Sequence, residues 1–585
     1  MLIKGRLFLF DLQRSIRNGK WCLLFPRFNK AVLKESQLIR GRALEGVGLV
    51  QPVNQSKALV KGALVLTIAA LITKILSAIY RVPFQNIVGD TGFYIYQQVY
   101  PIYGVALVLS TTGFPVVISK LYTEQKNKTD KQRLMVVSAL FLCFMGLLSF
   151  FILYFGAGWI AELMNDPKLT VLIRVISIIF LTAPVTALIR GFYQGTGYMN
   201  PTAYSQVGEQ LVRVGTILVI AVLFMKANYS LYEVGAGAMF GSITGGIVGA
   251  VILITFIWVR KDYQRIQIKE FFQTFRYKET SVIVKTLLIQ GFAVCISSML
   301  LLLLQLADSL NLYSLLISNG INGEDAKVLK GIYDRGQPLI QLGAVVATSM
   351  SLSLVPLIAS ERIKNSVEQL YENIQLAIRV SLTIGLGASV GLITIMKPTN
   401  MMLFENSEGS NVLSIVSITI LFSSLIITLI AILQGLGYTV FPALVVLAGF
   451  LMKYGLNLLL VPVYGTMGAA VASNCALILI VGILLFKMKV LIKKQLVVIP
   501  FMLKAIFSAL IMYVVLEGFI YISDYLYILG HFRLVATLQA LCAAVIGGLT
   551  YMLVIIRTKV FTAEELTLLP FGSKIMHLFP GRNRR

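Results

Sequence analysis

Residues 412–433 read VLSIVSITILFSSLIITLIAIL, a run of 22 residues without a charged side chain. A helix that crosses the hydrocarbon core of a bilayer needs about 20 predominantly apolar residues, so this run predicts a transmembrane helix. The same criterion predicts an all-α, multi-pass membrane protein with about 14 transmembrane helices. The other predicted spans are 58–80, 93–119, 134–156, 170–190, 203–225, 233–258, 286–307, 332–359, 373–396, 440–462, 466–486, 500–521 and 534–556.

The composition excludes most soluble proteins. Of the 585 residues, 57% are hydrophobic and only 13% are charged, whereas soluble proteins carry about 25% charged residues. The five cysteines and two histidines are scattered without metal-ligand spacing. The sequence therefore predicts no cofactor, no metal site and no enzymatic activity.

The small charged fraction is strongly basic, with 51 Lys and Arg against 26 Asp and Glu. Of the basic residues, 27 fall in loops after even-numbered spans or at the C-terminus, and only 8 fall in loops after odd-numbered spans. Cytoplasmic loops of membrane proteins carry the excess of Lys and Arg. Both termini are therefore predicted to be cytoplasmic, and the basic excess reflects topology, not a nucleic-acid partner.

The chain repeats itself at an offset of about 240 residues. Gln194-Gly-Thr-Gly-Tyr198 recurs as Gln434-Gly-Leu-Gly-Tyr438. Each repeat has six predicted spans, so the two halves share one orientation, and the substrate site of such transporters lies near the midplane between them. The predicted organisation is a basic cytoplasmic extension (1–57), a first lobe (58–258), a basic cytoplasmic linker (259–285), a second lobe (286–486), a final helix pair (487–560) and a cytoplasmic tail (561–585).

Charged residues inside predicted spans are the candidate functional residues, because a charge at the bilayer centre costs roughly 2.5–3.5 kcal/mol. Lys74, Ser77 and Arg81 have the i, i+3, i+7 spacing of one helix face, with two cations and no acid. This face predicts an anion site, and the alternative for Arg81 is that it reaches the lipid headgroups. Arg335, in Tyr333-Asp-Arg-Gly-Gln-Pro338, is a further cavity candidate.

Two other groups of polar residues lie within predicted spans. Glu209 and Arg213 are four residues apart, so they either neutralise each other or form a polar wall of the cavity. Asp308 has no neighbouring cation in the sequence, while a later span carries Lys453 and Asn457, followed by Ser473. We hypothesise that Lys453 pairs with Asp308 and takes the place of a coupling cation, because paired buried charges cost less than unpaired ones.

The 14 spans, the two repeats, Leu76-Ser-Ala-Ile-Tyr-Arg81 and Tyr333-Asp-Arg-Gly-Gln-Pro338 together resemble a known family. The chain is similar to the polysaccharide exporters of the multidrug/oligosaccharidyl-lipid/polysaccharide superfamily, and among them it resembles the flippases related to MurJ and to stage V sporulation protein B. The resemblance covers about residues 58–560.

The resemblance implies two lobes that work by alternating access, cavity arginines that bind a lipid-linked pyrophosphate, and a last helix pair that holds the polyprenyl tail. The cavity arginines of the family carry over to Arg81 and Arg335, whereas its basic position on the second helix is replaced by the uncharged Tyr100-Pro-Ile-Tyr103. A sodium site found in some relatives would fall on Asp308, Asn457 and Ser473. Lys453 in that neighbourhood favours a drive by the membrane potential instead.

The sequence therefore predicts a bacterial plasma-membrane flippase for an undecaprenyl-pyrophosphate-linked saccharide, such as a peptidoglycan precursor or a related cell-wall polysaccharide. Its partners would be this substrate, membrane lipids and the cell-envelope synthesis machinery. The main alternative is a multidrug or cation antiporter of the multidrug and toxin extrusion (MATE) type, which would need acidic and aromatic cavity residues. A membrane-embedded glycosyltransferase would need a larger acidic outer loop than residues 308–331.

Overall fold

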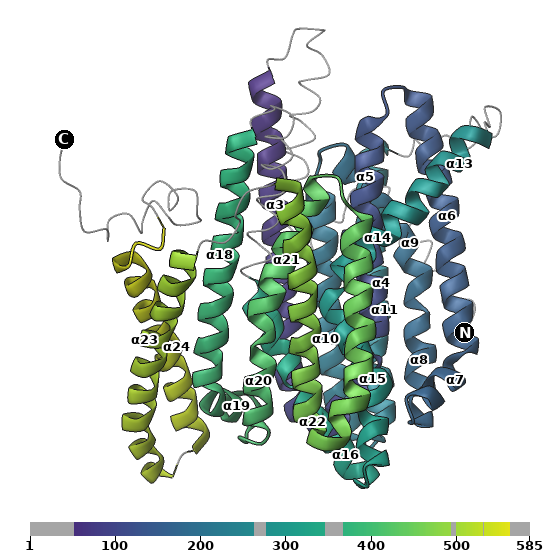
Figure 1. The fold of residues 1–585 in the computed structure, drawn as a ribbon. Helices are drawn as coiled ribbons and strands as arrows, with labels where there is room; N and C mark the ends of the chain where they lie inside the picture. Colours follow the sequence, from purple (N-terminus) through teal and green to yellow (C-terminus); the bar gives the residue numbers. More distant parts are fainter. Residues whose placement is uncertain (1–51, 263–276, 346–366, 493–498, 531, 562–585) are drawn as a thin grey trace, which may run out of the picture. The chain divides into compact units, whose positions relative to one another are not determined.

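A computed structural model describes residues 52–262, 277–345, 367–492, 499–530 and 532–561 (Figure 1). All regular secondary structure in these ranges is helical, and 12 of the described helical segments are long and apolar enough to cross a membrane. The predicted all-α membrane fold is confirmed. The predicted number of 14 spans is not.

The predicted 14 spans and the 12 candidate spans differ at a few places in the chain, and each difference has a local cause. Two candidate spans, Leu64–Glu124 and Val440–Ile492, are 61 and 53 residues long and each contains two predicted spans. The predicted span 286–307 corresponds instead to two candidates, which meet at Met299. Half of the predicted span 332–359, residues 346–359, lies outside the described residues.

The chain divides into two compact units, residues 1–60 and 61–585, and the second unit contains every candidate site residue. Most of the predicted extension (1–57), the middle of the linker (263–276) and nearly all of the tail (561–585) lie outside the described residues.

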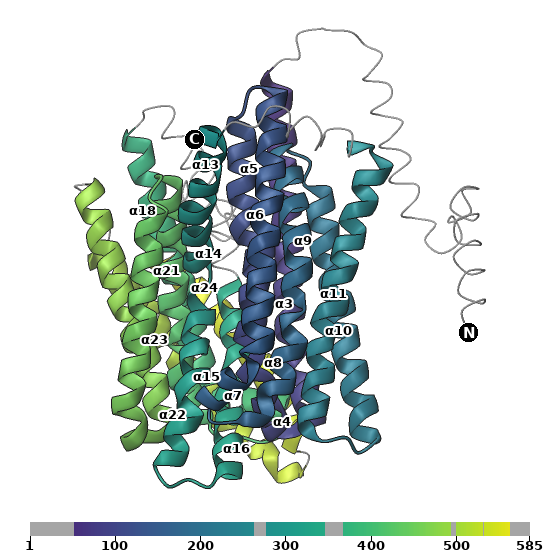
Figure 2. The same cartoon turned by 90° about the vertical axis from the view of Figure 1, so that its right-hand side faces the viewer.

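The first lobe contains long, nearly parallel helices joined by short turns (Figures 1 and 2). Antiparallel α10 and α11 pack along their lengths, and α9 packs on α5, α6 and α11. The helices of this lobe are α3 (Pro52–Ile79), α4 (Arg81–Val108), α5 (Phe114–Glu124), α6 (Lys128–Phe155), α7 (Ala157–Leu163), α8 (Thr170–Ser177), α9 (Ile179–Gly195), α10 (Asn200–Lys226) and α11 (Leu231–Val259), with a π-turn η2 (Leu109–Gly113) and a 3-10 turn η3 (Pro167–Leu169).

The second lobe has the same character, and the final helix pair packs on its α18 and α19 (Figure 1). Its helices are α13 (Tyr277–Thr286), α14 (Phe292–Ser298), α15 (Leu300–Ser318), α16 (Gly323–Asp334), α18 (Val367–Thr394), α19 (Met396–Phe404), α20 (Ser410–Ser417), α21 (Thr419–Gly435) and α22 (Val440–Ile492), with a π-turn η5 (Leu287–Gly291). The final pair is α23 (Ile499–Ser523) and α24 (Phe532–Arg557), joined by η6 (Asp524–Leu529).

Two of the gaps between predicted spans contain kinks within helices that the structure assigns as single elements. Gly89 has φ 69° within α4, and Gly465 has φ 57° within α22. Glycine adopts this left-handed region without steric cost. Gly465 thus divides α22 at the turn predicted between the spans 440–462 and 466–486.

The prediction that residues 308–331 form an outer loop is wrong. Helix α15 continues to Ser318, and α16 begins at Gly323. Leu312 and Leu316, in the part of α15 beyond Asp308, are fully buried in the largest apolar cluster. Burial of these side chains stabilises the helix past Asp308, the charged residue at which the sequence predicted the loop to begin. The same cluster includes Phe93 of α4 and Val416 of α20, which means that the two lobes share one core where α4 meets the second lobe.

Candidate functional site

Four arginine side chains are among the largest fully buried groups of the described residues: Arg81, Arg190, Arg213 and Arg335. A guanidinium cannot lose its charge in a protein, and a charge inside a membrane needs compensation from a partner or a wet cavity. The partners of each arginine therefore separate structural roles from candidate binding roles.

Arg213 of α10 is held by neutral hydrogen-bond acceptors. Its Nη2 donates to the hydroxyls of Tyr80 and Tyr96, at 3.0 and 3.1 Å. Its Nε donates to Ser242 Oγ at 3.2 Å, and its Nη1 donates to Gln210 Oε1 at 3.3 Å. These contacts fix the orientation of the guanidinium and leave its positive charge without a carboxylate in direct contact.

Aromatic rings surround the same guanidinium. Its central carbon lies 4.0 Å from the ring centroid of Tyr103 and 5.7 Å from that of Tyr100. Tyr80, Tyr96, Tyr100 and Tyr103 form what we call the tyrosine cluster, and all four side chains are buried. The faces of aromatic rings attract cations, so the cluster stabilises positive charge without neutralising it.

Arg190 of α9 forms a buried ion pair with Glu209 of α10, with Nη2 and Oε2 2.6 Å apart. It also donates to Ser205 Oγ at 3.1 Å and to the Ser110 carbonyl at 3.0 Å. The alternative in which Glu209 neutralises Arg213 at i+4 is wrong, because the carboxylate meets a guanidinium from the neighbouring helix α9 instead.

Arg81, at the start of α4, is the exception among the four. Its guanidinium lies over the ring of Tyr100, 4.1 Å from the centroid. None of its three nitrogen atoms has a hydrogen-bond acceptor in bonding geometry among the described residues. The arginine is fully buried, so the part of the chain that the structure describes leaves its hydrogen-bond donors unused.

The predicted face of Lys74, Ser77 and Arg81 is only partly formed. Arg81 is buried, whereas the Lys74 side chain is exposed and has no hydrogen-bond or ion-pair partner within the described part of the chain. The two residues also belong to different helices, because α3 ends at Ile79 and α4 begins at Arg81. The tertiary packing of the tyrosine cluster gave them different surroundings.

Arg335, directly after α16, links the two lobes. Its Nε and Nη2 donate to Asp90 of α4 at 2.6–2.9 Å, and its Nη1 donates to Asn406 Oδ1 at 2.7 Å. Asp334 pairs with Lys330 at 2.8 Å. The carboxylate that pairs with Arg335 thus comes from a position 245 residues away in the sequence.

The contact between α4 and α16 is also close at the backbone. A Cβ atom at Gly331 would lie 2.2 Å from the carbonyl oxygen of Asp90. Only glycine permits this approach, and it brings Arg335 within reach of the Asp90 carboxylate. The two lobes are thus joined here by an ion pair and by direct backbone packing.

The second lobe contains the predicted pair of Asp308 and Lys453, with Nζ and Oδ2 2.5 Å apart. Asn457 donates to Asp308 Oδ1 at 3.0 Å, and the Tyr333 hydroxyl donates to Oδ2 at 3.0 Å. Ser473 lies 3.4 Å from the Tyr333 hydroxyl. All five side chains are buried, so the structure brings together all four residues that the sequence grouped here.

Comparison with known proteins identifies the family of the chain. Residues 59–361, about half of the chain, match the family described as polysaccharide biosynthesis protein. The chain belongs to this family. The uncharacterised membrane protein YabM of Bacillus subtilis (strain 168) is 46% identical over 522 residues, which cover 88% of this chain and 95% of YabM.

The resemblance to MurJ-related flippases is confirmed by two further matches. The lipid II flippase MurJ of Bacillus subtilis (strain 168) is 27% identical, over 85% of this chain and 95% of MurJ. A structure of lipid II flippase MurJ in its inward closed conformation has the same fold, with a TM-score of 0.60 at 17% identity, over 85% of this chain and 99% of MurJ. An inward-facing MATE multidrug transporter has the fold too, with a TM-score of 0.57 at 16% identity, over 72% and 96% of the two chains.

Sequence reasoning missed three parts of the site: Arg190, Asp90 and the tyrosine cluster. Arg190 and Asp90 fall at predicted helix ends, where charges are usual. A signal for the cluster was present, because Tyr96, Tyr100 and Tyr103 have the i, i+4, i+7 spacing of one helix face. These tyrosines are uncharged and lie in an apolar span, so nothing in the sequence marked their shared helix face as functional.

The buried pair of Arg190 and Glu209 predicts a specific pattern of stability. Arg190→Ala leaves the Glu209 carboxylate buried and unpaired, so we expect a loss of about 3–5 kcal/mol. Arg190→Met combined with Glu209→Gln removes both charges and should lose clearly less. Thermal unfolding of the purified protein in detergent measures both effects.

The exposed ion pair of Arg533 and Glu405 is the matched control. Arg533→Ala should cost only about 0–1 kcal/mol, because exposed ion pairs contribute little. Equal losses for Arg190→Ala and Arg533→Ala would contradict a structural role for the buried pair.

Proposed function

We propose that this protein moves an undecaprenyl-pyrophosphate-linked saccharide, a peptidoglycan precursor or a related cell-envelope polysaccharide, across the bacterial plasma membrane by alternating access. The observation that carries the proposal is Arg81. It is a permanent cation, fully buried in a membrane protein, and its donors are unused among the described residues.

The surroundings of Arg81 suit an anionic ligand. Arg81 and Arg213 both lie against the Tyr100 ring, at 4.1 and 5.7 Å. No described carboxylate forms an ion pair with either one. A pyrophosphate group offers several charged acceptor oxygens, and guanidinium groups bind such oxygens through short, charge-assisted hydrogen bonds. Two cations without a carboxylate therefore favour a phosphate-bearing substrate.

The other candidates take supporting roles in this proposal. Lys74 is exposed and free to make the first contact with the substrate. Glu209 and Arg213 form the polar wall of the site, with Glu209 held by Arg190. Arg335 would reach the substrate only after its ion pair with Asp90 opens. Opening of the contact between α4 and α16 thus becomes one step of the alternating-access cycle.

The hydrophobic tail needs a second surface, and we assign it to α23 and α24. Each helix carries a face of exposed large apolar side chains, including Leu503 and Leu510 on α23 and Leu541 and Leu549 on α24. A polyprenyl chain can lie along such faces while the pyrophosphate occupies the site between the lobes. Both termini would be cytoplasmic, where the cell-envelope synthesis machinery could deliver the substrate.

The alternative is a MATE-type multidrug or cation antiporter. A cationic drug would need a carboxylate in the first lobe, and Glu209 is already paired with Arg190 at 2.6 Å. The second lobe offers Asp308, which is paired with Lys453. These two carboxylates are thus neutralised by cations of the same chain, which favours the anionic substrate.

Transport should depend on the charge of Arg81. We expect Arg81→Gln to lower the translocation rate roughly 10- to 100-fold, because a hydrogen bond to a charged group contributes about 1.5–3 kcal/mol. Arg81→Lys should retain part of the activity. The measurement is translocation of a fluorescent lipid-linked pyrophosphate saccharide in proteoliposomes.

Arg533→Gln is the control for this experiment, because Arg533 is exposed and forms its ion pair outside the tyrosine cluster. Full transport by Arg81→Gln, in protein that folds as the parent does, would refute the assignment of Arg81 to the substrate.

For coupling, we propose that Lys453 serves as an internal cation. Its ammonium is bound to Asp308, within a set of oxygen-bearing side chains that also includes Asn311, Tyr333, Asn457 and Ser473. Asn457 Oδ1 is buried without a hydrogen-bond partner among the described residues, so the set retains an unused acceptor. Transport would then need no external sodium and would draw on the membrane potential, which supplies about 2.3 kcal/mol per charge per 100 mV.

Removal of the charges one at a time tests this coupling proposal. Asp308→Asn and Lys453→Met should each destabilise the protein by about 3–5 kcal/mol, and the double variant should lose less. Transport by the parent protein should be equal in sodium and choline chloride buffers. Additive losses, or a strict requirement for sodium, would overturn the role of Lys453.

A further inference from the structure

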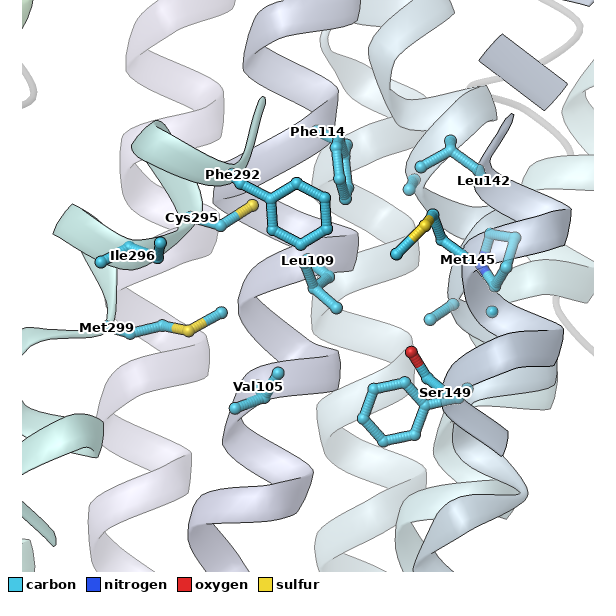
Figure 3. Close-up of a pocket in the computed structure, with 15 residues that line it drawn as sticks. Val105, Leu109, Phe114, Leu142, Met145, Ser149, Phe292, Cys295, Ile296 and Met299 are labelled. Atoms are coloured by element: carbon cyan, nitrogen blue, oxygen red, sulfur yellow. The ribbon is translucent and has the colours of Figure 1, made fainter. Parts of the chain in front are cut away.

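A cavity of about 240 Å³ lies between α4, α6, α9 and α14, away from the residues assigned to the substrate (Figure 3). Of the described residues that line it, Ser149 alone carries a hydroxyl, amide or charged group. For comparison, an apolar cavity of about 150 Å³ in another protein is large enough to bind benzene.

The cavity is elongated along the helices. On α6 it is lined from Leu142 to Ser149, and on α14 from Phe292 to Met299. Seven residues of α-helix rise by about 10 Å. Figure 3 shows the α14 side chains and those of α4 on one side and Met145 and Ser149 of α6 on the other. We call this space the apolar slot.

The depth of the apolar slot determines the chemistry of what can occupy it. Helix α6 is a candidate membrane span from Lys128 to Phe155, and the stretch from Leu142 to Ser149 lies near its middle. The hydrocarbon core of a bilayer is about 30 Å thick and contains lipid chains and almost no water. An apolar cavity at this depth, long and aligned with the helices, fits a hydrocarbon chain.

The surroundings provide a route from the bilayer. Phe144 and Leu148, the neighbours of the slot-lining residues on α6, are exposed, as are Leu288 and Ile289 just before α14. Helix α6 packs on α8, α9 and α13, whereas α14 packs on η2, η5 and α22. The apolar slot thus lies between α6 of the first lobe and α14 of the second lobe, next to side chains that are exposed on the surface of these segments.

The substrate's own tail is a poor match for this position. Tyr100 and Tyr103 of the tyrosine cluster are on α4, and the slot-lining residues Val105 and Leu109 continue the same helix. At 100° per residue, Val105 and Leu109 point about 140° or more away from Tyr100. A pyrophosphate bound at Arg81 and the apolar slot are therefore on opposite sides of α4.

From this geometry we infer that the apolar slot binds an acyl chain of a bilayer lipid, which packs between α14 of the second lobe and the α4–α6–α9 group of the first. Two π-turns, η2 and η5, lie at one end of the slot and contact α14 and α5. Such turns often mark functional positions in helices. The bound chain fills the gap between the lobes near η2, which separates α4 from α5, and η5, which separates α13 from α14.

Photolabelling in defined vesicles tests this inference. The parent protein is reconstituted in phosphatidylglycerol and phosphatidylethanolamine that contain a trace of phosphatidylglycerol with a diazirine in mid-chain. After irradiation, adducts are mapped by mass spectrometry. We expect adducts at Met145, Ser149 and Met299 that persist when lipid is removed with detergent before irradiation, whereas adducts at the exposed Phe144 and Leu148 are lost.

Substitutions that fill the apolar slot provide the second arm. Ala183 of α9 and Ser149 of α6 both line the apolar slot. Ala183→Phe and Ser149→Phe should each abolish the persistent adducts, and Leu148→Phe, on the lipid-facing side of α6, should leave them unchanged. Two filling variants from different helices guard against a folding defect in one of them. Persistent adducts that survive in both variants would overturn the inference, as would preferential labelling of the slot by a diazirine-bearing polyprenyl pyrophosphate.

Discussion

Compensation of guanidinium charge inside the membrane is the constraint on which this structure depends. Arginine keeps its charge at any physiological pH, so each buried arginine needs a partner supplied by the fold. Arg190 has Glu209, Arg335 has Asp90, and Arg213 has the tyrosine hydroxyls and rings. Within the described residues, Arg81 lies over the ring of Tyr100, and none of its nitrogen atoms has a hydrogen-bond partner in bonding geometry. Three of the arginines are thus compensated by the fold, and the fourth is the one that we propose for the ligand.

The second lobe meets the same constraint with a lysine. Lys453 and Asp308 neutralise each other within a set of polar side chains from α15, α16 and α22. The lobes are therefore chemically different despite their repeated sequence, because Arg213 of the first lobe corresponds to Lys453 of the second at an offset of 240 residues. The first lobe surrounds its cation with tyrosines and the second gives it a carboxylate. This difference is consistent with the proposed division into substrate binding by the first lobe and coupling by the second.

Much of the fold could be predicted because membrane spans are marked by composition alone. The run 412–433, the repeat of the Gln-Gly-x-Gly-Tyr motif and the turns at Gly89 and Gly465 led directly to the helices that the structure contains. The number of spans could not be predicted in the same way. A break as slight as that at Met299 leaves no compositional trace, and the apolar extension of α15 to Ser318 is stabilised by packing with the other lobe.

The site was harder to predict, because partners that come from different helices are not adjacent in sequence. The pair of Lys453 and Asp308 was predictable, since two isolated buried charges of opposite sign had few alternatives. The partner of Arg335 is Asp90, 245 residues away, and nothing in the sequence connects the two. The unsatisfied state of Arg81 depends on where the rings of the tyrosine cluster lie, which is a property of tertiary packing.

The charge preference of ligand binding distinguishes an anion site from a drug site. In nanodiscs, undecaprenyl pyrophosphate and the hydrophobic cation tetraphenylphosphonium can be titrated against the parent protein and Arg81→Gln, with binding followed by native mass spectrometry. If Arg81 provides an anion site, the pyrophosphate lipid binds the parent protein, binds Arg81→Gln much more weakly, and is not displaced by the cation. Equal binding of the pyrophosphate lipid to both proteins, or its displacement by tetraphenylphosphonium, would contradict an anion site at Arg81.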